Sequence, residues 1–81
     1  MEKEHLKTRF REKLDLFCLF HLGSDVQMNL REETDQLWVS LQHHRIEPLE
    51  FSITYARLED FLEDTAQLER FLLEEITSHR R

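Results

Sequence analysis

Glycine, proline and cysteine each occur only once in this chain, at Gly23, Pro48 and Cys18. Because Gly and Pro favour breaks and turns, their scarcity argues against long loops and against disorder. A single cysteine excludes an intramolecular disulfide and is typical of a reducing compartment. Since Gly23 stands alone, a glycine-rich phosphate-binding loop is excluded as well.

Long apolar runs are also missing. No run approaches the ~18–20 residues of a membrane span, and the start of the chain lacks the pattern of a secretory signal. We therefore expect a cytoplasmic protein. The 81 residues predict a single domain over residues 1–81, and a domain of this size buries only about 60–65% of the surface of its unfolded chain. With so thin a core, association with a partner chain is the expected source of added stability.

The net charge of −6 is unevenly distributed. Residues 1–13 carry five Lys and Arg against three acidic residues, whereas residues 14–81 carry six against fourteen. The beginning of the chain is therefore basic and the remainder acidic. A nucleic-acid-binding protein usually has a broader basic face with aromatic residues in it, so direct nucleic-acid binding is not expected.

Apolar residues at three- and four-residue intervals predict a helix over residues 2–22. Leu6, Phe10, Leu14 and Phe17 lie on one face of this helix. Gly23 follows it, where a left-handed C-terminal cap is favoured.

Three stretches then alternate between apolar and polar residues, the period of half-buried strands. They span residues 26–31, 37–42 and 49–55, and Pro48 precedes the third. Short links between them predict an antiparallel meander in which the first and third strands are edges, either of which can accept a strand from a partner. A helix over residues 25–43 is the alternative, but a period of two fits the apolar positions better.

From Ala56 onward the apolar period is helical. One unbroken helix would place Glu69 in its apolar stripe and leave Phe71 outside, so a break near Asp64 and Thr65 is favoured, with one of these two residues as the N-cap of the second segment. The expected fold class is therefore α+β: an N-terminal helix, a three-stranded antiparallel meander and one or two C-terminal helices packed on one sheet face.

No group of residues indicates catalysis, a metal or a cofactor. His43 and His44 are adjacent near a strand end and are expected to point to opposite faces, where they cannot easily share a metal ion. Cys18 and His21 are three residues apart on a helix but lack a second pair of ligands. The apolar neighbours of Cys18 also argue against a nucleophile. We therefore expect a protein that is not an enzyme.

The stretch LDLFCLFHLG, residues 14–23, has apolar residues at seven of its first nine positions. On a helical wheel Phe20 falls within an arc of about 120° that includes the core face, while Leu16 and Leu19 lie on one flank of that arc. Cys18 and Leu22 lie on the other flank. A C-terminal helix can cover one flank, so the other is available to a second chain.

We therefore expect a homodimer through Leu16, Leu19 and Phe20. Lys7 and Arg11 are expected to meet the acidic helix of the neighbouring copy. Trp38, on the polar side of the second strand, is a further candidate for partner binding.

Two functions follow from these features. The first is a small acidic protein-interaction module, such as an adaptor, a chaperone or a subunit of a larger complex. The alternative is an acidic inhibitor or nucleic-acid mimic, such as a phage-encoded inhibitor, that presents carboxylates to a basic groove. Its candidate residues are Glu59, Asp60, Glu63 and Asp64, continued by Glu69, Glu74 and Glu75. A solvated helix face is the simpler explanation of these acids, and salt dependence of binding separates the two functions.

Overall fold

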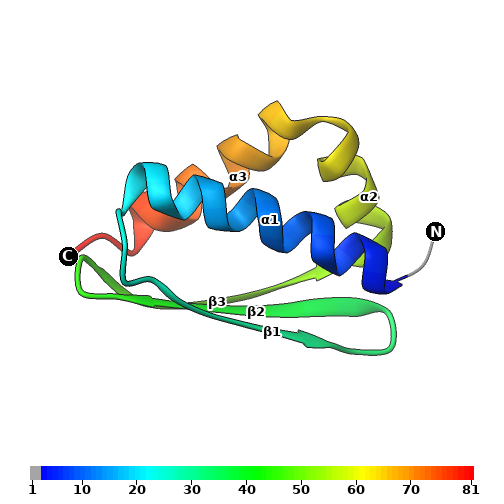
Figure 1. The fold of residues 1–81 in the computed structure, drawn as a ribbon, viewed down its shortest axis with the longest axis horizontal. Helices are drawn as coiled ribbons and strands as arrows, with labels where there is room; N and C mark the ends of the chain where they lie inside the picture. Colours follow the sequence, from blue (N-terminus) through cyan, green and yellow to red (C-terminus); the bar gives the residue numbers. More distant parts are fainter. Residues whose placement is uncertain (1–2) are drawn as a thin grey trace.

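A computed structural model describes residues 3–81 and has the predicted α+β fold. The three helices of residues 3–81 lie on one face of the three-stranded sheet, and none of these helices covers the other face (Figure 1). The predicted first residue of the N-terminal helix, Glu2, lies outside the described residues. In chain order the elements are α1 (Lys3–His21), β1 (Gln27–Glu32), β2 (Gln36–His43), β3 (Ile46–Thr54), α2 (Tyr55–Glu63) and α3 (Thr65–Ser78).

The sheet has the strand order β1-β2-β3, and both pairs are antiparallel. Antiparallel register places Leu30 and Phe51 on either side of Val39, so these three side chains share the face that the helices cover. β2 is the central strand, and its inward side chains Leu37, Val39 and Leu41 are fully buried. The period of two over residues 26–42 therefore indicated strands correctly, and the helical alternative is wrong.

Helix α1 buries one long face against the sheet and ends at a left-handed cap. Leu6, Phe10 and Leu14 are completely buried in the core. Gly23 has φ +86°, and its N–H donates to the carbonyls of Cys18 and Leu19, both at 3.1 Å. A Cβ at Gly23 would meet no atom within 4 Å, so its backbone conformation, not lack of space, favours glycine.

Within residues 3–81, no helix has both the length and the apolar character needed to cross a bilayer.

Strand β3 begins earlier than the sequence indicated, at Ile46 instead of Leu49. Pro48 therefore lies inside the strand, at the position where the register with β2 shifts between Leu41 and His43. Such an irregularity accommodates proline, which cannot donate a hydrogen bond to the ladder. It also explains why Ile46 and Leu49, three residues apart, are both buried.

The predicted break in the C-terminal helical region is confirmed. Helix α2 ends at Glu63, and Asp64 is the N-cap of α3, where its Oδ1 accepts from the N–H of Gln67 at 3.4 Å. The break changes the phase of the helix. Phe71 consequently turns toward the core, and its ring lies 5.3 Å from that of Phe51, edge to face.

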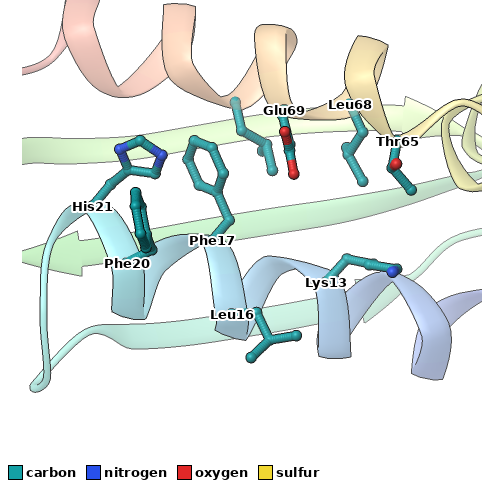
Figure 2. Close-up of a pocket in the computed structure, with 9 residues that line it drawn as sticks. Lys13, Leu16, Phe17, Phe20, His21, Thr65, Leu68 and Glu69 are labelled. Carbon is teal, nitrogen blue, oxygen red and sulfur yellow. The ribbon is translucent and has the colours of Figure 1, made fainter.

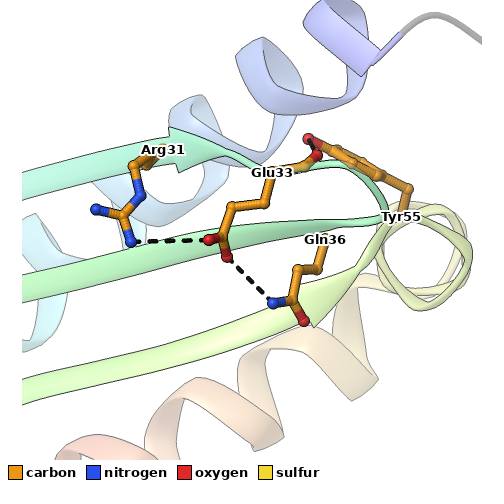
Figure 3. A network of polar contacts seen from close by, with 4 residues as sticks. All are labelled: Arg31, Glu33, Gln36 and Tyr55. Atoms are coloured by element: carbon orange, nitrogen blue, oxygen red, sulfur yellow. Dashed lines mark hydrogen bonds and ion pairs between the residues drawn. The ribbon is translucent and has the colours of Figure 1, made fainter.

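The turn between β1 and β2 is held by side chains (Figure 3). Glu33 accepts from Nε2 of Gln36 at 3.1 Å, and its other carboxylate oxygen lies 3.8 Å from the guanidinium of Arg31. The hydroxyl of Tyr55 donates to the backbone carbonyl of Glu33 at 3.4 Å, which joins the start of α2 to this turn. Desolvation, together with the carboxylates of Glu32 and Glu33, raises the pKa of Tyr55.

The last residues of the chain pair with the start of β3, a contact that the sequence did not indicate. The N–H of Glu47 donates to the carbonyl of His79 at 2.7 Å, and the N–H of Arg81 donates to the carbonyl of Arg45 at 3.0 Å. Ile46 and Arg80 form an antiparallel bridge. The first part of the β3 edge is thus covered, whereas β1 pairs only with β2 among the described residues. Of the two predicted edges, β1 is the more open.

Candidate functional site

Three large apolar side chains of α1 are exposed. Leu16, Leu19 and Phe20 have exposed fractions of 64%, 60% and 85%, and we call them the α1 patch. The opposite flank, Cys18 and Leu22, is buried. The prediction that one flank of the helix is covered within the chain and the other is left open is therefore correct. The prediction that Phe20 lies on the arc that covers the sheet is wrong, because this side chain is the most exposed of the large apolar residues described.

A groove of about 440 Å³ lies beside the patch, between α1 and α3. Buried side chains from both helices, Phe17, Leu68 and Leu72, form its apolar floor. Leu16 and Phe20 stand at its edge. In Figure 2 Phe17 and Glu69 point into the space between the helices, whereas Leu16 points away from α3. We call this feature the α1–α3 groove; its remaining lining residues are Lys13, His21, Thr65 and Glu69.

The groove follows from the way the two C-terminal helices are placed. Helix α2 packs closely on α1, and the break at Asp64 then redirects the chain into α3, which packs on α2 and on β3. α1 and α3 approach each other less closely than either approaches α2, so the space between them stays partly open. One local event, the capping of α3 by Asp64, thus positions one wall of the groove.

Aromatic contacts hold the end of α1 in place. The ring of His21 lies 4.3 Å from that of Phe17 and 5.0 Å from that of Phe20, the latter in an edge-to-face arrangement. These contacts connect an exposed ring to a buried one through His21. Phe20 is consequently held near the rim of the groove although water surrounds most of its surface.

The charges at the groove are of opposite sign, because Lys13 belongs to the α1 wall and Glu69 to the α3 wall. Lys7 and Arg11, which we expected to contact the neighbour of a dimer, line a separate shallow pocket with Glu32 of β1. They lie on the other side of α1 because residue 11 is about 140° around the helix from residue 16. Lys13 is therefore the cation next to the α1 patch.

The other predicted partner-binding residues lie on different surfaces. Trp38 points to the sheet face that no helix covers, and it is half-buried beneath the guanidinium of Arg31, 4.6 Å from the ring centroid. Of the acidic residues, Glu59 is half-buried, whereas Asp60 and Glu63 are exposed. Asp64 has a structural role as the cap of α3. The structure thus brings Leu16, Leu19 and Phe20 together but places Trp38 and the acidic residues from Glu59 to Asp64 elsewhere, whereas Glu69 lines the α1–α3 groove.

The cysteine and histidine residues that we considered for catalysis or metal binding do not form a reactive or metal-binding site among the described residues. Burial, with a contribution from Asp15, raises the pKa of the Cys18 thiol to about 11, which disfavours the reactive thiolate. Within residues 3–81, no cluster of three or more His, Cys, Asp or Glu side chains is arranged to hold a metal ion.

We expected His43 and His44 to point to opposite faces. This prediction is wrong, because their rings lie 4.2 Å apart. His44 follows the last residue of β2, so the alternation of a strand does not apply to it. The N–H of Arg45 donates to Nδ1 of His43, and Nε2 therefore carries the proton and donates to the carbonyl of Ser24 at 3.2 Å. His43 thus joins the α1–β1 link to the turn between β2 and β3.

Comparisons with known proteins add no further information about this site. No family model matches the chain, and neither the curated proteins nor the solved structures include a significant match.

Proposed function

We propose that this protein is a small protein-binding module that acts as a homodimer through the α1 patch and the α1–α3 groove. The observation that carries the proposal is the position of an exposed apolar ring, Phe20, at the rim of a groove with an apolar floor. Because Phe20 and the groove lie on the same surface, a two-fold dimer can place the Phe20 ring of each copy in the groove of the other.

In this arrangement Phe20 of each copy enters the groove of the other and contacts Leu68 and Leu72. Leu16 and Leu19 pack against the partner's α1. Lys13 and Glu69 lie at the edge, where opposite charges fix the relative position of the two copies more than they add affinity. An isologous contact of this kind closes on itself, so it gives dimers and not filaments.

The expected affinity follows from the exposed area of the α1 patch. At about 1.5–3 kcal/mol for a whole Leu or Phe side chain, burying the exposed parts of the three residues contributes about 3–6 kcal/mol per chain. Two chains contribute about 6–12 kcal/mol, against an association cost of about 4–15 kcal/mol. The difference is at most about 8 kcal/mol in favour of association, so the patch alone gives a dissociation constant no tighter than about 1 μM. Contacts of Phe20 with the groove of the partner decide whether this limit is approached, and we expect dimers at tens of micromolar.

A binding role is preferred to a catalytic one because the floor of the groove is apolar and the thiol of Cys18 is buried and protonated. The dimer would serve as an adaptor, a chaperone or a subunit of a larger complex. We place it in the cytoplasm because a free buried thiol is compatible with a reducing compartment.

The inhibitor hypothesis relies on a different surface, the acidic residues of α2. Asp60 and Glu63 are exposed and form no ion pair with any of residues 3–81. Binding through this surface would weaken steeply with added salt, whereas an apolar interface would respond little. Salt dependence therefore belongs in the test of the dimer.

Sedimentation equilibrium over a concentration series tests the proposal, with Leu16→Glu as the variant and Leu73→Glu as the matched control. Both changes introduce the same charge at an exposed leucine, but Leu73 does not line the α1–α3 groove. The wild type and the Leu73→Glu variant should dimerise at tens of micromolar in both low and moderate salt, and the Leu16→Glu variant should stay monomeric with unchanged circular dichroism. A monomeric wild type at these concentrations, or equal effects of the two substitutions, would exclude this dimer.

A further inference from the structure

Another cavity, of about 400 Å³, lies where three distant parts of the chain meet. The end of α1, the turn between β2 and β3, and the C-terminus are close together at one end of the molecule (Figure 1). The residues that line this cavity are His21, Leu22, His44, Arg45, Arg80 and Arg81. We call it the basic cavity.

The basic cavity has an unusual charge for this protein. No Asp or Glu side chain lines it, although acidic residues outnumber Lys and Arg by fourteen to six over residues 14–81. Three of those six cations, Arg45, Arg80 and Arg81, lie at this one place. Only Arg81 has an acidic contact among residues 3–81, with Glu47 at 4.0 Å between its guanidinium and the carboxylate. The cavity is thus a positive region on an acidic molecule.

Backbone hydrogen bonds hold these cations together. The N–H of Arg81 donates to the carbonyl of Arg45, and the N–H of Glu47 donates to that of His79. Nε of Arg81 also donates to the carbonyl of Ile46 at 3.0 Å. Bringing like charges together opposes folding. These hydrogen bonds oppose that repulsion and keep the arginines adjacent.

The arginines of the basic cavity are not needed to satisfy the carbonyl groups at the C-terminal ends of α1 and α3, because carbonyls at both ends already have partners. At the end of α1 the carbonyl of Cys18 accepts from the N–H groups of Leu22 and Gly23. At the end of α3 the carbonyl of Glu75 accepts from both the backbone N–H and the ring Nδ1–H of His79. The guanidinium groups of Arg45 and Arg80 form no hydrogen bond or ion pair with residues 3–81. They are therefore available to a ligand.

We propose that the basic cavity binds a small phosphorylated anion, of the size of an oligophosphate or the phosphate chain of a nucleotide. Guanidinium groups match phosphate oxygens in a two-point geometry, and imidazole N–H groups can add single hydrogen bonds. The volume of about 400 Å³ lies within the range of small-molecule sites. A nucleic acid is not favoured, because a long polyanion would extend from this cavity over the acidic remainder of the surface.

The cations have different roles in this site. Arg45 and Arg80 supply the free guanidinium groups, one from each of the two segments that the backbone bridge between Ile46 and Arg80 brings together. Arg81 is partly engaged with Ile46 and Glu47, so it mainly fixes the geometry. His44, whose ring stacks on that of His43, contributes from the turn.

Isothermal titration calorimetry with inorganic triphosphate in ~50 mM salt tests the proposal, since more salt screens such contacts. The variant is Arg45→Gln/Arg80→Gln, and the control is Arg11→Gln/Arg70→Gln, which changes the net charge equally at exposed positions outside the cavity. We expect the cavity variant to lose at least about tenfold in affinity, and the control to change by less than about twofold. His21 also lines the α1–α3 groove, so the protein concentration is kept below that at which dimers form.

Three outcomes would overturn the proposal: no binding of triphosphate at millimolar concentration, equal losses in the two double variants, or tighter binding of single-stranded DNA than of triphosphate. NMR titration of the wild type gives an answer that does not depend on the variants. Amide shifts should be confined to the turn between β2 and β3, the end of α1 and residues 79–81, and shifts spread over α2 or β1 would contradict the assignment. Dimerisation through α1 can fail without affecting either result.

Discussion

Phe17 and Phe20 are three residues apart on α1, and replacing each by alanine should have opposite consequences. Phe17 is only 8% exposed, so Phe17→Ala creates a cavity in the core and should lower the free energy of unfolding by about 3–5 kcal/mol. Phe20 is 85% exposed, so Phe20→Ala removes little buried surface, on the order of 0.5 kcal/mol. The higher helix propensity of alanine offsets a similar amount. At low protein concentration Phe20→Ala should therefore be almost neutral.

The dependence on concentration separates the fold from the dimer. Because dimerisation stabilises only the folded chain, the urea midpoint of the wild type should rise between ~1 and ~100 μM protein. Phe20→Ala should remove this rise. Phe17→Ala should lower the midpoint at both concentrations.

Urea titrations followed by circular dichroism measure all of these quantities. A loss of more than about 2 kcal/mol for Phe20→Ala at low concentration would mean that Phe20 is buried within its own chain, which contradicts its exposure in the structure. An unchanged rise with concentration in this variant would mean that Phe20 takes no part in association.

Three further measurements examine other parts of the molecule. Asp64→Ala removes the acceptor for the Gln67 N–H and should lower the free energy of unfolding by about 1 kcal/mol, while Glu63→Ala, one residue earlier, should change it by less than about 0.5 kcal/mol. The pKa of Cys18 is raised from 9.0 to about 11, so the stability provided by its buried protonated thiol is fully present below pH 9 and is lost as the pH rises toward 11. Unfolding titrations across this range should show a larger loss in the wild type than in Cys18→Ala, where Tyr55, whose pKa is also raised, still contributes. Equal pH dependence of the two proteins would contradict the assignment. In hydrogen exchange the Glu47 amide, which donates to His79, should be protected, whereas amides on the outer edge of β1 should exchange rapidly in the monomer. Slow exchange along the whole β1 edge of a proven monomer would show that this edge is not open.

The fold class and the order of the elements could be predicted because the signals for them are local. The alternation along β2 and the cap at Asp64 or Thr65 each depend on neighbours in the sequence. The structure has the alternation, and of the two candidate caps it uses Asp64. Strand β3 was harder to delimit. Its alternation is interrupted at Pro48, and a register shift with β2 is a property of two strands that the pattern of one strand does not contain.

The candidate site could be predicted only in part. Helical geometry separated Leu16 and Leu19 from Cys18 and Leu22, and only the second pair is buried. The exposure of Phe20 depends on where α3 lies relative to α1, which periodicity within one helix does not determine. The groove between the two helices therefore became visible only in three dimensions.

The basic cavity was missed for a similar reason. Of its three arginines, Arg45 lies more than thirty residues before Arg80 and Arg81 in the sequence, where nothing indicates that they lie together. The bridge between Ile46 and Arg80 brings them together. A contact over so many residues depends on how α2 and α3 return the chain to the sheet, and no local pattern carries that information.

The most direct test of the proposed dimer is an isotope-filtered NMR experiment on an equimolar mixture of ¹³C-labelled and unlabelled chains, which detects only contacts between copies. The account predicts nuclear Overhauser effects from the ring of Phe20 in one copy to the methyl groups of Leu68 and Leu72 in the other. Contacts between copies that involve Leu73 or the open face of the sheet instead, or no contacts at all at a concentration of hundreds of micromolar, would contradict it.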